Sequence, residues 1–157
     1  MDKTFNILNE LLVENFNDLI SIEQKALSEG EFSDLSITEI HTIEAIGMYS
    51  ARTMSEVAAD LDITVGTLTI AINNLVKKGY VERRRAEEDR RVVLIQLNKR
   101  GKLAYRIHNK FHMDMIKATI EDITEEEEQV LVKALEKLNN FFKEKYHLPQ
   151  GKKENKV

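Results

Sequence analysis

One short stretch of the chain is rich in arginine, and it contains Arg84, Arg85, Arg90 and Arg91. Two β-rich segments, Tyr80–Arg84 and Val92–Leu97, flank the stretch and predict a hairpin that carries the arginines at or near its tip. A basic hairpin tip can bind phosphates or enter the minor groove of a nucleic acid. The stretch therefore indicates a surface that binds a polyanion.

The residues directly before this hairpin predict a short helix over Val65–Lys78. Thr64 can cap its N-terminus, and Gly79 can end it. One side carries apolar residues at helical spacing, which we expect to be buried: Leu68, Ile72, Leu75 and Val76. The opposite face carries small or polar side chains, namely Gly66, Thr67, Thr69, Asn73, Asn74 and Lys77. Such a face fits a DNA major groove, and a helix followed by a basic hairpin is the arrangement of a winged helix that reads DNA.

Charge is unevenly distributed along the chain. The formal net charge is −4, which on its own argues against a nucleic-acid partner. Residues 77–106, however, hold 11 Lys/Arg and 4 Asp/Glu, whereas the other residues hold 12 and 23. The local field at the contact surface governs association with a phosphate backbone. Many charge runs are only solvated faces, but the position of this run beside a helix-turn-helix pattern favours DNA binding.

Composition excludes several other classes of protein. The 157 residues include no cysteine, so disulfides, thiol redox sensing and thiolate metal sites are excluded. We find no secretory signal and no apolar stretch of about 18 residues that could cross a bilayer, and we expect a cytoplasmic protein without a membrane partner. No phosphate-binding glycine loop and no Ser/His/Asp set is evident, so we expect neither an enzyme nor a cofactor. The acidic run Glu125–Glu128 fits helix capping better than catalysis.

The remaining elements are predicted to be helices. Apolar periodicity over residues 3–28 predicts a long amphipathic helix. Capping boxes, in which two side chains satisfy each other's backbone N–H groups, are formed by Ser36 with Glu39, Thr53 with Glu56, and Thr124 with Glu127. They predict helices at 36–47 and 54–61 and from 124 to about 146. Asn98 can cap a further helix that runs to about residue 122.

We therefore predict a single domain over residues 1–157 that is mainly α with a small β-hairpin wing. A winged helix-turn-helix over 36–97 would bind DNA, and helices at 3–28 and 99–147 would form a dimer. Residues 148–157 are expected to form a flexible tail. Apolar side chains on the terminal helices need a partner surface, and they are Phe5, Leu8, Leu12, Phe16, Phe141 and Phe142. A two-fold homodimer would bury them; the alternative is packing on the core of their own chain.

The pattern resembles the MarR family of bacterial transcription regulators over about residues 3–147. The resemblance is strongest in the wing, DRRVVLI at 89–95, and in the helix start TVGTLT at 64–69. It implies that Arg91 enters a minor groove and that Asp89 holds its guanidinium. A narrow A·T-rich minor groove concentrates negative potential and attracts arginine, and a carboxylate can hold a guanidinium in a bidentate pair.

The exposed face of the predicted reading helix departs from the family pattern. Many members carry arginines where this chain has Ile70 and Asn74. Base readout would then depend on Thr67, Thr69 and Asn73, with apolar contact from Ile70 to thymine methyl groups. This combination suits an A·T-rich target.

A narrower resemblance is to the fatty-acid-synthesis repressors of Gram-positive bacteria, a MarR subgroup. It is carried by residues 36–47, 64–93 and 106–116. It implies long-chain acyl-acyl carrier protein as corepressor, with the acyl chain in a tunnel between the dimer helices and the winged helix. The alternatives are a MarR-type regulator of another pathway with a different small-molecule or metal effector, and a winged helix that serves only as a protein-interaction module. A protein-interaction module has no need of four arginines at a hairpin tip.

Two histidines on one predicted helix are candidate metal ligands. His108 and His112 are four residues apart on one helix face, which is a metal-ligand spacing, but two ligands do not make a site and the sequence suggests no third. We therefore predict no metal site and favour a role in packing, dimerisation or effector binding. His41 is expected to be partly buried near the first helix.

Overall fold

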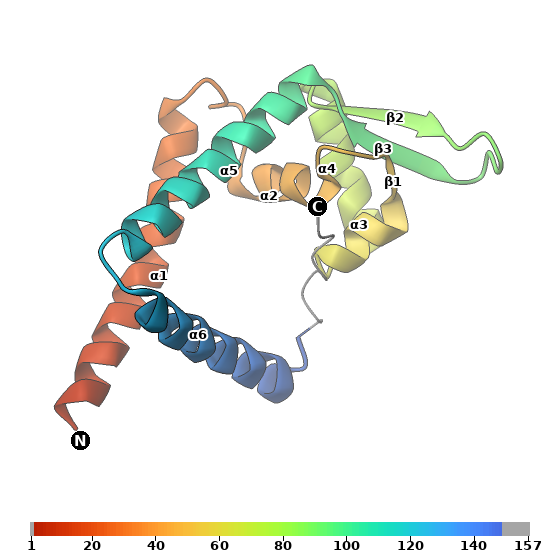
Figure 1. Cartoon of the computed structure of the whole chain (residues 1–157). Coiled ribbons are helices and arrows are strands. Elements are labelled where there is room, and N and C mark those ends of the chain that lie inside the picture. The colour runs from red at the N-terminus through yellow and green to blue at the C-terminus, as the bar shows by residue number, and fades with distance from the viewer. Residues whose placement is uncertain (1, 149–157) are drawn as a thin grey trace.

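The computed structural model describes residues 2–148. Its elements follow one another in the order α1 (Lys3–Glu29), α2 (Ile37–Ile46), β1 (Arg52–Thr53), α3 (Met54–Asp60), α4 (Val65–Lys77), β2 (Val81–Arg85), β3 (Val93–Leu97), α5 (Lys99–Ile120) and α6 (Glu125–Tyr146). The chain is mainly α with a small antiparallel sheet, as predicted (Figure 1). The predicted flexible tail falls outside the described residues except for Leu148.

Polar caps begin the helices where the sequence predicts them. Ser36 Oγ accepts a hydrogen bond from the backbone N–H of Glu39 at 3.2 Å, and the Glu39 carboxylate accepts one from the N–H of Ser36 at 2.9 Å. Equivalent capping boxes begin α3 and α6. Gly47 follows α2 with a φ of 76°, a conformation that glycine adopts without steric cost.

The sheet has three strands in the order β1-β3-β2, all antiparallel. The predicted hairpin is confirmed, and Arg83 lies opposite Ile95 in its register. The third strand, β1, was not predicted. It has only two residues, of which Arg52 pairs with Ile95, and so short a strand has no periodicity that a sequence pattern could reveal.

The hydrophobic core lies within the winged helix-turn-helix. Leu68, Ile72 and Leu75 of α4 are fully buried, as predicted, while Val76 is partly buried against them. Ile43 of α2 and Ile95 of β3 are also fully buried. The buried stripe fixes α4 so that its opposite face is left at the surface.

Helix α5 begins in very close contact with the hairpin. A Cβ at Gly101 would overlap the carbonyl oxygen of Tyr80 and lie 3.2 Å from the Cβ of Leu97. The Tyr80 hydroxyl donates to Asp34 at 2.6 Å, and the Arg100 guanidinium lies 4.3 Å from the centre of the Tyr80 ring. Burial and the Asp34 carboxylate together raise the pKa of Tyr80. These contacts attach the long helix α5 firmly to the winged part.

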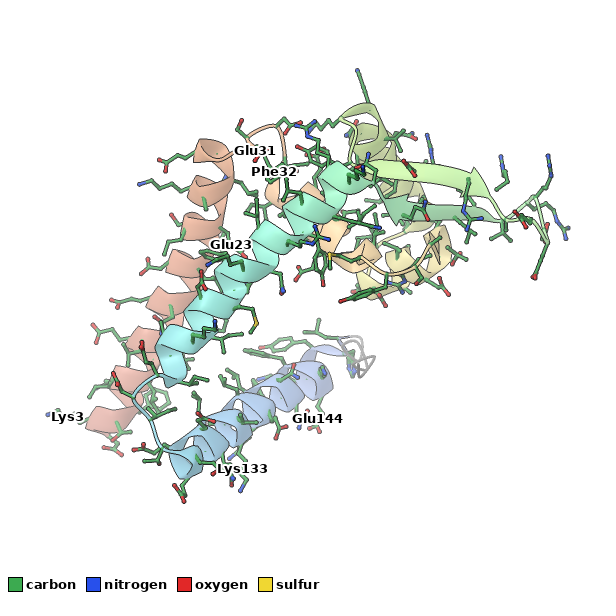
Figure 2. The ribbon with its side chains drawn as sticks, turned by 45° about the horizontal axis from the view of Figure 1, so that its top comes forward. Lys3, Glu23, Glu31, Phe32, Lys133 and Glu144 are labelled. Atoms are coloured by element: carbon green, nitrogen blue, oxygen red, sulfur yellow. The ribbon has the colours of Figure 1, made fainter. Side chains whose placement is uncertain are left out.

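Helices α1 and α5 extend away from the winged part, and α6 turns back from the far end of α5 (Figures 1 and 2). Helix α6 has no buried residue, and no helix within residues 2–148 is long and apolar enough for a membrane span. Six aromatic and aliphatic side chains that the sequence suggested for a dimer are between 36% and 58% exposed: Phe5, Leu8, Leu12, Phe16, Phe141 and Phe142. Within the single chain these side chains are therefore not part of the hydrophobic core.

Candidate nucleic-acid interface

The N-terminus of α4 is fixed by threonine side chains. Thr64 Oγ1 accepts a hydrogen bond from the N–H of Thr67 at 3.1 Å, and the two hydroxyl groups lie 2.9 Å apart. The hydroxyl of Thr69 donates to the carbonyl of Val65 at 2.8 Å, and Thr69 is only half-exposed. Thr69 can still accept a hydrogen bond from a ligand, whereas its donor is already used within the helix.

The outward face of α4 is available for contact over its whole length. The predicted site residues on it are exposed apart from Thr69, and they are Thr64, Gly66, Thr67, Ile70, Asn73, Asn74 and Lys77. Ile70 is 66% exposed although it is a large apolar residue in the middle of a helix. An apolar group in this position can pack against a thymine methyl group in a major groove.

The wing tip presents a guanidinium in a fixed orientation. Nε and Nη2 of Arg91 donate to the two carboxylate oxygens of Asp89 at 3.1 and 3.2 Å, and the backbone N–H of Arg91 donates to Asp89 at 3.0 Å. These hydrogen bonds hold the pKa of Asp89 below its usual value. The Arg91 side chain is 91% exposed, so the pairing orients the guanidinium and leaves it accessible.

The other predicted wing arginines differ in their surroundings. Arg84, Arg85 and Arg90 are exposed. Nη1 of Arg85 donates to the backbone carbonyl of Arg90 at 3.2 Å, so this side chain helps to close the hairpin tip. The tip itself is a tight turn, because the N–H of Val92 donates to the carbonyl of Asp89 at 2.9 Å.

Arg83, which was not among the predicted site residues, connects the wing to α4. Nη1 of Arg83 on β2 donates to Oδ1 of Asn73 at 2.6 Å. Arg83 also lines a shallow groove together with Thr69 of α4 and Arg91 of the wing. Side chains alternate between the two faces of a strand, so the sequence can indicate which residues share a face with Arg83. The contact of Arg83 with α4 depends on tertiary packing, which a sequence pattern does not reveal.

The exposed face of α4 and the wing therefore form one continuous surface, with polar donors and acceptors on the helix and cations on the hairpin. A helix of this kind fits a major groove, and the phosphate backbone that borders the groove would meet the wing.

The chain is similar to known transcription regulators. Residues 33–92 match the MarR family. FabT of Streptococcus pneumoniae, seen in a crystal structure in complex with DNA, is 42% identical over 89% of this chain and 98% of that chain, with a TM-score of 0.82.

Two proteins of Bacillus subtilis (strain 168) are similar in sequence. The uncharacterized HTH-type transcriptional regulator YfiV is 27% identical over 69% of this chain and 68% of its own length. The HTH-type transcriptional repressor YetL is 29% identical over 71% of this chain and 63% of its own length. The family match covers most of the winged helix, and the 42% identity to FabT of Streptococcus pneumoniae extends over 98% of that chain. The chain therefore belongs to the MarR family of helix-turn-helix transcription regulators.

Proposed function

We propose that this protein is a repressor of fatty-acid-synthesis genes that binds a palindromic, A·T-rich operator as a homodimer. The observation that carries the proposal is the Asp89–Arg91 pair, which presents an oriented guanidinium beside the exposed face of α4. In this proposal α4 reads the major groove, and Arg91 enters the flanking minor groove, whose negative potential is greatest in A·T-rich sequence.

Exposed apolar side chains on the terminal helices support the homodimer. Phe16 of α1 is 52% exposed, and Phe141 of α6 is 47% exposed. A two-fold interface would cover both helices with a second copy of the same patch. Two winged parts related by such an axis would read half-sites about one helical turn apart, which is why we propose a palindromic operator.

An apolar pocket supports a lipid effector. The pocket has a volume of about 90 Å³ and lies between α1, α2 and α5, where its apolar lining includes Leu27, Phe32, Ile40, Ala104, Ile107 and Phe111. This is the region between the dimer helices and the winged part. An apolar lining of this kind suits an acyl chain, which would have to widen the pocket as it enters. The resemblance to the fatty-acid-synthesis repressors implies long-chain acyl-acyl carrier protein as the effector.

Fluorescence anisotropy tests the function directly. The full chain is titrated into labelled duplexes from its own promoter, from a fatty-acid-synthesis promoter and from random sequence, at two salt concentrations. Each titration is repeated with long-chain acyl-acyl carrier protein. We expect tighter binding to a promoter than to random DNA, and tighter binding still with the acyl carrier protein.

Other outcomes separate the parts of the proposal. Specific binding that the acyl carrier protein leaves unchanged would refute the lipid effector but keep the repressor. If no titration shows salt-dependent DNA binding, the repressor function is refuted, because phosphate contacts make affinity depend on salt. That result would favour the protein-interaction module.

A further inference from the structure

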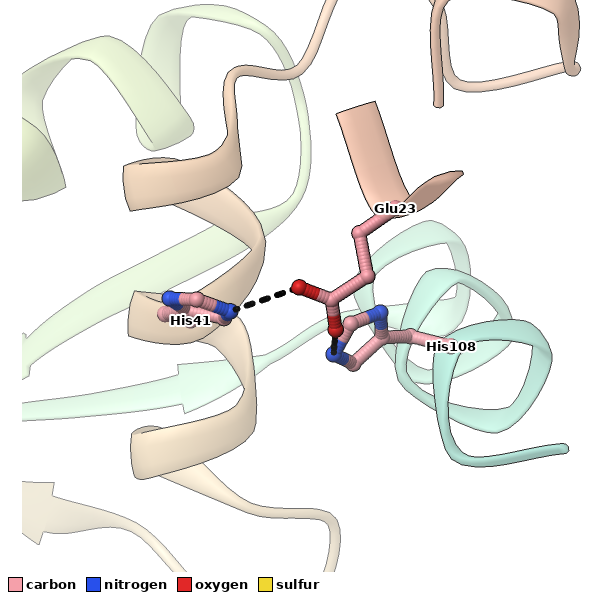
Figure 3. Close-up of side chains that lie close together, drawn as sticks. All are labelled: Glu23, His41 and His108. Atoms are coloured by element: carbon pink, nitrogen blue, oxygen red, sulfur yellow. Dashed lines mark ion pairs between the residues drawn. The ribbon is translucent and has the colours of Figure 1, made fainter. Parts of the chain in front are cut away.

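Four side chains that can bind metals converge where three helices meet. Glu23 comes from α1, His41 from α2, and His108 and His112 from α5. Each histidine turns its Nε2 toward the Glu23 carboxylate, at 3.9 Å for His41, 3.8 Å for His108 and 2.9 Å for His112. Figure 3 shows Glu23 between His41 and His108. The sequence suggested no third ligand beside His108 and His112, but the fold brings Glu23 of α1 and His41 of α2 to them.

The spacing of these atoms fits one small cation. Zinc with nitrogen and oxygen ligands at about 2.0–2.1 Å in a tetrahedron places neighbouring ligand atoms about 3.3 Å apart. The Nε2 atoms of His108 and His112 are 3.1 Å apart, and one ligand atom each of Glu23, His41 and His108 lies within 4.8 Å of the others. The distances from Glu23 to the three histidines, and the distance between His108 and His112, each lie within about 0.6 Å of that spacing.

Burial argues for a ligand at this place. Glu23 is 7% exposed and His108 is 8% exposed, although carboxylates and imidazoles are costly to bury without a partner. Nε2 of His112 lies 2.9 Å from the Glu23 carboxylate and 3.1 Å from Nε2 of His108. One proton on that nitrogen is shared between two partners, whereas a cation would bind the carboxylate and the imidazoles together.

We propose that this cluster is a site for a divalent transition metal of the zinc class, formed by Glu23, His41, His108 and His112. Three imidazoles and one carboxylate are ligands that suit zinc rather than magnesium or calcium. Glu44 lies outside the four ligands with its carboxylate 3.8 Å from Nε2 of His108, where it adds negative charge beside the ion.

The site would link the two functional parts of the chain. Helix α2 belongs to the winged helix-turn-helix, while α1 and α5 carry exposed apolar faces. An ion bound to all three helices would fix the winged part relative to the terminal helices. If the DNA-bound and the free dimer differ in this angle, metal affinity and DNA affinity are coupled reciprocally. Metal binding itself does not depend on the proposed repressor function, because it is measured without DNA.

The test uses untagged full-length protein that has been treated with a chelator and then titrated with Zn²⁺ by calorimetry. We expect one Zn²⁺ per chain and a rise in Tm of about 5–10 °C at a hundredfold excess of free zinc over Kd. His41→Gln and His112→Gln, both at partly exposed positions, should each weaken binding at least tenfold. The matched control is His147→Gln, which changes the one remaining histidine, an exposed residue after α6.

A second measurement does not depend on the variants being folded. In the unaltered protein, Zn²⁺ should shift the imidazole NMR signals of His41, His108 and His112 and leave those of His147 in place. Co²⁺ in the same site should give the intense visible absorption of a four-coordinate ion. The proposal is overturned if Zn²⁺ leaves the three cluster histidines unshifted, or if His147→Gln abolishes binding while the cluster variants retain it.

Discussion

Arg83 of β2 donates its guanidinium hydrogen bond to the side-chain oxygen of Asn73 on α4, over a distance of 2.6 Å. Because this bond occupies Oδ1, the Nδ2 donors of Asn73 are the part of the amide left for another partner. Asn73 is thereby suited to donate to base-edge acceptors such as thymine O4 or purine N7. In the proposed complex with DNA, the wing would therefore contribute to base readout through α4 as well as through its own tip.

We predict that Arg83→Met lowers operator affinity by about 1–3 kcal/mol and affects random DNA less, because it releases the Asn73 amide. Asn73→Ala should relax sequence preference in the same way, and the double variant should lose less than the sum of the two. Fluorescence anisotropy at one salt concentration measures the affinity of each variant for the operator duplex and for the random duplex. Arg84→Met is the control for charge, because the loss of an exposed cation should lower the affinity for operator and for random DNA equally. Equal losses of the two affinities in Arg83→Met would argue against the readout role.

We predict that Arg91→Ala weakens operator binding at least about tenfold and that Asp89→Ala weakens it less, because the guanidinium remains but loses its orientation. The control is Lys133→Ala, which removes a positive charge from α6, far from the wing (Figure 2). Operator titrations of the three variants at one salt concentration give the comparison. Unchanged affinity in Arg91→Ala would remove the wing from the proposed interface.

We predict that Gly101→Ala destabilises the fold by about 1–3 kcal/mol or more, because its Cβ would overlap the backbone of Tyr80. Gly66→Ala is the matched control. A Cβ there has only the Thr64 hydroxyl at 3.8 Å as a neighbour, so the helix preference of alanine should make it neutral or slightly stabilising. Urea unfolding of both variants checks the difference, and equal stability would contradict the close approach of α5 to the hairpin.

We predict that the protein is a dimer at micromolar concentration and that Phe16→Asp or Phe141→Asp shifts it toward monomer. A charge placed in a buried apolar interface is left without a partner. Ile70→Asp changes a still more exposed apolar residue on α4 and should leave the dimer intact. Sedimentation velocity distinguishes these results; a monomeric unaltered protein would refute the dimer.

We predict that Ala26→Trp abolishes the response to acyl-acyl carrier protein while DNA binding without it is retained. Ala26 lines the apolar pocket but is exposed, so a large side chain can narrow the pocket without disturbing the core. Ala26→Ser keeps the small volume and should respond normally. A full response of Ala26→Trp in the anisotropy assay would place the effector elsewhere.

Local patterns predicted the elements of this fold well. The capping boxes that begin at Ser36, Thr53 and Thr124 are all present, because a box depends on two side chains three residues apart. The buried stripe of α4 and the wing hairpin depend in the same way on near neighbours.

Contacts between distant residues could not be predicted. Glu23 and His41 approach His108 only because α1, α2 and α5 meet, and no spacing in the sequence records that meeting. The contact of Arg83 with Asn73 and the two-residue strand β1 are missed for the same reason. The DNA contacts of α4 and the wing stay predictions until they are measured.

Helix α6 has 22 residues and none of them is buried. A helix with so little tertiary support has only marginal stability on its own in water. In the proposed dimer, its folding and the association of two chains are then a single bimolecular event. At low expression the amount of assembled dimer rises with the square of the chain concentration, so halving the supply of protein would remove about three quarters of the active form. Gene control by such a protein would respond to its own abundance with a threshold rather than in proportion.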